Sequence, residues 1–167
     1  MTIYNIKDLN KLKDQIFTFD TNVFINLYCY NLYRNNQVEY ISNFLIKKQS
    51  KFYVDNTVIN EFINIYIKKY LKIDKFEKKE HRNTDNYITC LKNLKLILNN
   101  IKDSYNIIDY KSVNIFYNLQ NLENYENIFT KMEFTDYTIK ETTKINNAIL
   151  ITNDNDFNDC DINILKI

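Results

Sequence analysis

The sequence AILITND, residues 148–154, places a short apolar run just before a carboxylate. Apolar runs of this length, bounded by polar residues, are typical of strands that are buried on both faces of a parallel sheet. The sequence IFTFD, residues 16–20, repeats the pattern, and it too ends in an aspartate. Because both runs are almost entirely apolar, we expect these two strands to lie at the centre of the sheet.

The rest of the chain alternates between short strand-like runs and segments of helical period. Further strands are expected at residues 51–55 and 162–167, with a weaker one at 106–109. Apolar residues at helical spacing mark segments around 38–45, 58–66, 88–101, 113–119 and 137–146. With neither Gly nor Pro in the chain, we expect turns at Asn pairs, at residues 35–36, 99–100 and 146–147. This alternation predicts an α/β fold whose parallel sheet is covered on both faces.

Length and charge set the broad class of the protein. A chain of 167 residues is expected to form one domain, residues 1–167. Lys and Arg number 22 against 21 Asp and Glu, so overall charge indicates no class of partner. No apolar run approaches the roughly 18 residues of a membrane span, and the first residues lack an apolar signal core. We therefore expect a cytoplasmic protein with no membrane partner.

Missing residue types exclude several kinds of site. Without Gly there is no dinucleotide fingerprint, Walker loop, EF-hand loop or Gly-flanked nucleophile elbow. The single histidine, His81, lies among charged residues and excludes HExxH and three-histidine zinc sites. Three distant cysteines without a CxxC pair argue against a zinc ribbon or a disulfide framework, and are expected to be free thiols. Carboxylates are the remaining candidates for chemistry.

Two of these carboxylates follow the two central strands. Asp20 comes directly after residues 16–19, and Asp154 comes two residues after Thr152. Sites in open α/β sheets form beyond the carboxyl ends of the strands, so both acids are placed where a site is expected. Taken singly, each is also explained as a turn or helix-cap residue.

Two more acids lie on the predicted helices. Glu61 has Val58 three residues before it and Ile65 four residues after it, so it lies on or beside a buried stripe, where an unpaired carboxylate is costly. A Glu–Lys ion pair is the simpler explanation. Asp136 opens a helix, where an acid is favourable without any function. Jointly, the four acids suit a hard divalent ion, Mg²⁺ or Mn²⁺, that assists phosphodiester hydrolysis.

Four segments resemble motifs of the PIN domain family (PilT N-terminus), in particular its toxin-type, VapC-like ribonucleases. They are FDTNV at 19–23, VINEF at 58–62, Thr135-Asp136, and LITNDNDF at 150–157. The resemblance implies a three-layer α/β/α fold with a central, mostly parallel sheet of about four or five strands, and a Mg²⁺- or Mn²⁺-dependent ribonuclease site. By the same resemblance the catalytic and metal-ligating acids are Asp20, Glu61, Asp136 and Asp154, with Asp156 as a further acid of the metal site and Asn22 and Thr152 as supporting residues.

The chain departs from compact toxin-type members in a long, basic stretch between Glu61 and Asp136. We interpret it as a helical insertion around residues 66–104. Residues 68–82 hold seven Lys and Arg, and we expect Lys68, Lys69 and Lys72 to contact the RNA backbone. The alternative is an ordinary solvated helix face. This departure leaves the toxin subclass open.

The leading hypothesis is thus a metal-dependent endoribonuclease that cleaves single-stranded RNA, as the toxin of a toxin–antitoxin pair. Its expected partners are single-stranded or structured RNA, an antitoxin protein and a second copy of the chain. A non-catalytic PIN-like RNA-binding or interaction module is the alternative. A phosphoaspartate enzyme is disfavoured because position 22 is Asn, and a structure-specific DNA nuclease because the chain is small.

Overall fold

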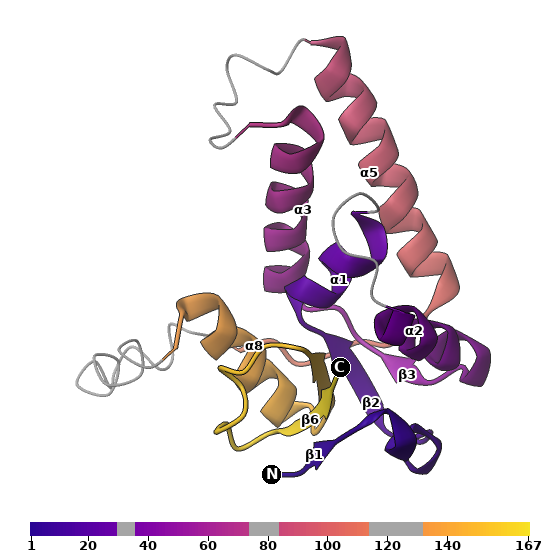
Figure 1. The fold of residues 1–167 in the computed structure, drawn as a ribbon, viewed down its shortest axis with the longest axis vertical. Coiled ribbons are helices and arrows are strands. Elements are labelled where there is room, and N and C mark those ends of the chain that lie inside the picture. The colour runs from indigo at the N-terminus through magenta and orange to yellow at the C-terminus, as the bar shows by residue number, and fades with distance from the viewer. Residues whose placement is uncertain (30–35, 74–83, 114–131) are drawn as a thin grey trace.

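The computed structural model describes residues 1–29, 36–73, 84–113 and 132–167 (Figure 1). The helix expected around 113–119 falls almost wholly outside these residues. So do His81 and the later part of the basic stretch, residues 74–82.

A single parallel sheet of six strands forms the middle of the protein. Its order is β1 (Ile3–Tyr4), β6 (Asn163–Lys166), β5 (Ile149–Thr152), β2 (Ile16–Phe19), β3 (Lys51–Phe52) and β4 (Asn106–Ile107). The two strands expected at the centre, β2 and β5, are the central pair, with Phe17 beside Ile149 and Phe19 beside Ile151. The α/β class and the parallel sheet are confirmed.

The strand count differs from the expected four or five. The sixth strand is β1, a two-residue edge strand paired with β6, which is too short to leave a pattern in the sequence. The strand expected at 51–55 is paired only at Lys51–Phe52, because Asp55 already accepts a hydrogen bond from the N–H of Thr57 and caps the next helix.

The helices are η1 (Ile6–Lys11, a 3₁₀ helix), α1 (Thr21–Tyr28), α2 (Asn36–Lys48), α3 (Asn56–Leu71), α5 (Asp85–Ser104) and α8 (Phe134–Ile145). Helix α1 was not expected, because its eight residues are too few to show a helical period. The turn expected at residues 99–100 is wrong. That pair lies inside α5, where buried side chains before and after it hold the helix together. At Asn146-Asn147 the helix ends as expected, with Asn147 at a φ of 48°.

Helices cover both faces of the sheet. On one face, Phe19 of β2 packs its ring 5.4 Å from that of Phe24 in α1 and 5.8 Å from that of Tyr105, which follows α5. On the opposite face, the hydroxyl of Tyr53, just after β3, donates to Thr143 Oγ1 of α8 at 3.4 Å. The order is therefore α/β/α, as the alternation of side chains along a strand requires.

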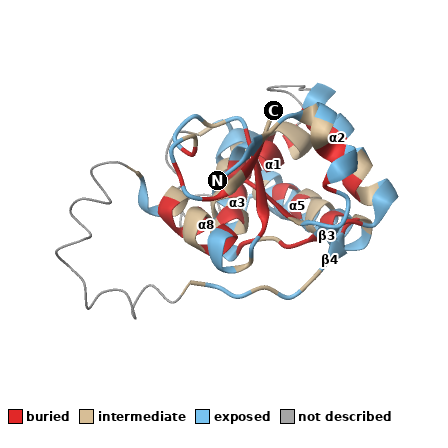
Figure 2. Ribbon diagram, turned by 90° about the horizontal axis from the view of Figure 1, so that it is seen from below, coloured by how far each residue is buried: buried red, intermediate tan, exposed pale blue. Residues whose placement is uncertain are grey.

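The core runs through the sheet and along the helix sides that face it, as the buried residues in Figure 2 show. All four residues of β5 are buried, which explains why its sequence has no polar alternation. Cys29, Cys90 and Cys160 are free and buried, as expected. Within the described ranges, no helix is long and apolar enough to cross a membrane.

Candidate active site

Asp20 lies at the carboxyl end of β2, and it is 3% exposed. Its N–H donates to the carbonyl of Ile151 at 3.1 Å, which continues the pairing of β2 with β5 by one residue. Although Asp20 occupies the N-cap position of α1, its side chain forms no capping hydrogen bond. Oδ2 instead accepts from the hydroxyl of Thr152 at 2.8 Å. The side chain is thus directed to the neighbouring strand end, and the cap explanation fails for this residue.

Asp154 begins the turn that follows β5. Its N–H donates to Thr152 Oγ1 at 2.9 Å, so the same hydroxyl contacts both strand-end acids. The Asp154 carboxylate accepts the N–H of Asp156 at 2.9 Å. These local bonds hold a partly buried carboxylate at the same edge of the sheet as Asp20.

Glu61 is half-buried on α3, about one and a half turns from its start. The hydroxyl of Thr21, the first residue of α1, donates to Glu61 Oε2 at 2.7 Å. In the described part of the chain, Glu61 forms no ion pair. The ion pairs found there join other residues, such as Lys11 with Asp8 and Lys144 with Asp161. The ion-pair explanation of Glu61 is therefore not what the structure shows.

Asp136 lies in the first turn of α8. An acid there normally gains from the helix dipole, which favours its charged form. Here the pKa of Asp136 is instead raised to about 7, first by burial and then by the charges of Asp20, Asp154, Glu133 and Glu61. Asp136 is thus an acid held near other acids.

The four acids act on one another although four different elements carry them. Burial is the main cause that raises the pKa of Asp20, and the charges of Asp154 and Glu61 raise it further. Repulsion of this kind is what a bound cation relieves. Among the described residues, however, no three His, Cys, Asp or Glu side chains lie close enough together to hold a metal ion.

The chemistry of this donor set fits Mg²⁺ or Mn²⁺, which prefer oxygen ligands. Mg²⁺ usually keeps several waters and binds through one or two carboxylates together with substrate phosphate. An open group of acids is compatible with that mode of binding. The same group of acids does not fit an ion that is enclosed by protein ligands alone.

The remaining predicted residues are placed less centrally. Asn22 Nδ2 approaches Asp20 Oδ2 at 3.5 Å, a weak contact. Asp156 is exposed, and its backbone N–H donates to the Asp154 carboxylate.

The three lysines expected to contact RNA, Lys68, Lys69 and Lys72, are exposed at the end of α3. They lie 7 to 11 residues beyond Glu61, or roughly 10–16 Å along the helix at 1.5 Å per residue. Figure 1 shows this end of α3 pointing away from the sheet, beside α5.

Two polar residues of the site were not singled out from the sequence. Thr21 holds Glu61, and its signal was its place in the DTN segment after Asp20. Lys166, at the end of β6, donates through Nζ to the carbonyl of Asp154 at 2.6 Å and to Asn158 Oδ1 at 3.0 Å. No local pattern distinguished this lysine from the others in the chain.

Comparison with known proteins shows the fold. No family model matches the chain, and no curated protein matches its sequence. Among solved structures it is similar to a chain in the crystal structure of VapBC2 from Rickettsia felis bound to a DNA fragment from their promoter. The TM-score is 0.59, the alignment covers 91% of this chain and 98% of that chain, and the sequence identity is 16%. This chain has a PIN-like fold. The structural similarity shows the PIN-like fold alone, because 16% sequence identity is too low to carry an activity from one chain to the other.

Proposed function

We propose that this protein is a metal-dependent endoribonuclease that hydrolyses phosphodiester bonds of single-stranded RNA. The observation that carries the proposal is the placement of Asp20, Glu61, Asp136 and Asp154 near one another, where burial first and then the charges of the neighbouring acids raise the pKa of Asp136 to about 7. Acids that destabilise one another at one sheet edge are typical of functional sites rather than of structural ion pairs. The resemblance of their motifs to PIN domains supports the same activity.

The chain's own residues would orient the site. Thr152 fixes Asp20 and the start of the Asp154 turn, and Thr21 fixes Glu61. Asp20, Glu61 and Asp154 would hold Mg²⁺ or Mn²⁺ together with Asp136, and a divalent ion so bound would supply an activated water and stabilise the leaving oxygen. Without a bound cation the pKa of Asp136 is about 7, so Asp136 is partly protonated at neutral pH, and a divalent ion that binds there would displace this proton.

We also propose that the protein is a toxin controlled by an antitoxin partner. The shared fold with a chain of the VapBC2 assembly supports this, together with the VapC-like motifs. An adjacent small gene whose product binds this chain and blocks RNA cleavage would establish the pairing. Cleavage that no neighbouring gene product inhibits would contradict it.

A non-catalytic RNA-binding module is the second candidate. It is favoured by the absence, within the described ranges, of three acids close enough to hold an ion. Under this function the protein binds RNA in the presence of a chelator, and Mn²⁺ neither binds to it nor produces cleavage.

The test is cleavage of a single-stranded RNA with Mn²⁺, with Mg²⁺ and with chelator, by the wild type, Asp20→Asn and Asp154→Asn. We expect cleavage only with metal, and a loss of more than about 100-fold in both variants, beyond the 10–100-fold typical for residues that only support a metal ligand. Asp159→Asn is the matched control, because Asp159 is an exposed acid beyond the Asp154 turn. Full activity in Asp20→Asn or Asp154→Asn would contradict the proposal.

A further inference from the structure

Lys166 connects the end of β6 to the turn that carries Asp154. Its ammonium group donates to the main-chain carbonyl of Asp154 at 2.6 Å and to Asn158 Oδ1 at 3.0 Å. It therefore contacts both the first residue of this turn, Asp154, and the last, Asn158. Strand β6 is the neighbour of β5 in the sheet, and Lys166 is paired with Thr152 in the register. The contact is therefore made across two strands, by a residue 12 positions away in sequence.

Few other contacts join the turn to the rest of the protein. Phe157 holds it to the core, since this side chain is fully buried. Asn153, Asn155 and Asp156 are exposed, and the remaining hydrogen bonds of the turn are mostly within it or to Thr152. Phe157 fixes the middle of the turn, whereas Lys166 fixes the peptide group of Asp154 itself.

The charge of Lys166 is not used in an ion pair with a carboxylate of the described residues. Both of its acceptors are neutral oxygens, a carbonyl and a side-chain amide. A surface lysine that serves only solubility needs no such pair of contacts, and a lysine that serves only charge balance would contact an acid. Hydrogen bonds from a charged donor are shorter and stronger than those between neutral groups, so they hold the backbone that they contact more firmly.

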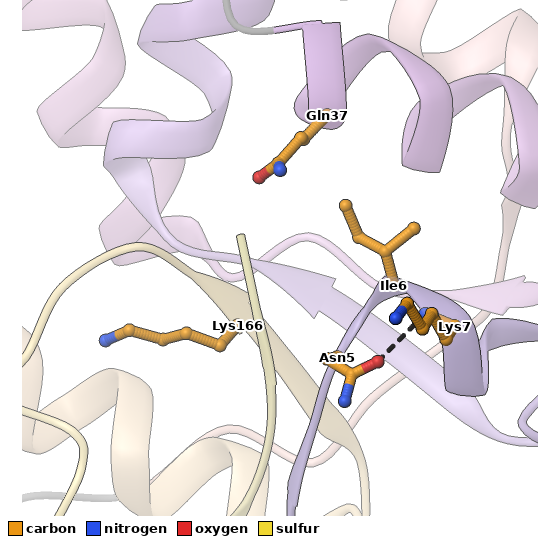
Figure 3. Close-up of a pocket in the computed structure, with 5 residues that line it drawn as sticks. All are labelled: Asn5, Ile6, Lys7, Gln37 and Lys166. Atoms are coloured by element: carbon orange, nitrogen blue, oxygen red, sulfur yellow. Dashed lines mark hydrogen bonds between the residues drawn. The ribbon is translucent and has the colours of Figure 1, made fainter.

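The shape of the surroundings supports a role toward the turn rather than toward a ligand. Asn5, Ile6, Lys7, Gln37 and Lys166 line a pocket of about 240 Å³ (Figure 3). This volume is below the roughly 300–1,000 Å³ of small-molecule sites. Figure 3 shows the Lys166 side chain running away from Asn5 and Lys7. Lys166 lines the pocket with its alkyl stem and places its ammonium group at the Asp154 turn.

We propose that Lys166 is a positioning residue, which holds the Asp154 main chain so that the Asp154 carboxylate stays aimed at the group of acids. The role of Lys166 in catalysis rests on the proposed function. Its effect on the position of the Asp154 carboxylate does not depend on any activity. Residues that orient a metal ligand typically affect metal affinity by 10–100-fold when they are removed.

Two measurements on the full chain test the inference. The first is amide hydrogen exchange of Asp156, whose N–H donates to Asp154 Oδ1 and so reports where that carboxylate lies. The second is the affinity for Mn²⁺ alone, measured by calorimetric titration. In Lys166→Met we expect Asp156 to exchange at least about tenfold faster and Mn²⁺ to bind about 10–100-fold more weakly. Lys166→Arg, which keeps charged donors at this position, is expected to recover most of both.

Lys7→Met is the matched control, because it removes the other lysine of the same pocket, one that contacts neither Asp154 nor Asn158. An Asp156 amide that exchanges equally fast in the wild type and in Lys166→Met would overturn the inference. So would equal losses of Mn²⁺ affinity in Lys166→Met, Lys166→Arg and Lys7→Met. If the wild type binds no Mn²⁺ while Lys166→Met still speeds exchange at Asp156, the positioning role holds and the metal-dependent function fails.

Discussion

The hydroxyl of Thr152 donates a hydrogen bond to Oδ2 of Asp20 at 2.8 Å, across 132 positions of sequence. The two residues end neighbouring strands of one parallel sheet, and both are buried. The same hydroxyl accepts the N–H of Asp154 at 2.9 Å. One side chain therefore sets the spacing of the two strand-end acids.

Replacing Thr152 by Val should loosen both acids. The change keeps the shape of the side chain but leaves the Asp20 carboxylate and the Asp154 N–H without their partner. We expect unfolding to become easier by about 1–3 kcal/mol, the usual cost of orphaned buried polar groups. Thermal denaturation measures the effect, and Thr152→Ser, which keeps the hydroxyl, should lose much less. A Thr152→Val variant as stable as the wild type would mean that the hydroxyl does not matter, and a loss confined to Thr152→Ser would mean that the methyl group does.

The raised pKa of Asp136 predicts a pH dependence of stability in chelator. The folded protein holds a proton at Asp136 up to a pH of about 7, whereas the unfolded chain releases it near 3.8. Between these values the folded state binds more protons, so the free energy of unfolding should fall as the pH rises. Asp136→Asn should therefore raise the melting temperature more at pH 8 than at pH 4. A gain that is the same at both values would contradict the raised pKa.

Divalent metal should stabilise the protein through the acids. An ion present at 10–100 times its dissociation constant adds roughly 1.4–2.7 kcal/mol if it binds only the folded state. For a domain of this size that corresponds to a rise of about 3–10 °C in melting temperature. Asp20→Asn should lose most of this rise, while in chelator it should be no less stable than the wild type, because an Asn oxygen can still accept from Thr152. Marked instability of Asp20→Asn in chelator would show that Asp20 has a structural role instead.

The basic end of α3 should contribute RNA affinity without chemistry. Changing Lys68, Lys69 and Lys72 to Glu should weaken the binding of a single-stranded RNA, and each lost phosphate contact should flatten the log–log salt dependence by about 0.7. Fluorescence anisotropy at several salt concentrations measures both. The matched control is Lys7, Lys11 and Lys13 to Glu, the same change of charge on and beside η1. An unchanged slope would mean that this end of α3 is an ordinary solvated surface.

Much of the fold followed from the sequence because its strongest signals are local. The runs at 16–19 and 149–152 are apolar since both faces of their strands are covered, and that same burial makes them the central pair. The edge strand β1 and the helix α1 left no such signal. Two residues are too few to alternate, and the eight residues of α1 form little more than two turns, too few to establish a helical period.

The identity and order of the acids were also determined by the sequence. Asp20 and Asp154 follow strands, and the carboxyl ends of parallel strands meet at one edge of a sheet, so their proximity was a consequence of the predicted topology. Glu61 and Asp136 lie on helices, and only packing decided that they face those two acids. That packing raises the pKa of Asp136, because it buries the carboxyl group and brings the other acids near it.

The contacts that hold the acids were decided by tertiary structure alone. Thr21 reaches Glu61 across 40 positions, and Thr152 reaches Asp20 across 132. Lys166 is one of many lysines in a Lys-rich chain, and its role arises only because β6 lies beside β5. A hydrogen bond depends on where two atoms lie in space, and sequence spacing fixes that position only within one helix or strand. The sequence therefore supplied the acids and the strands, and the packing of one element on another supplied the geometry that could make them a site.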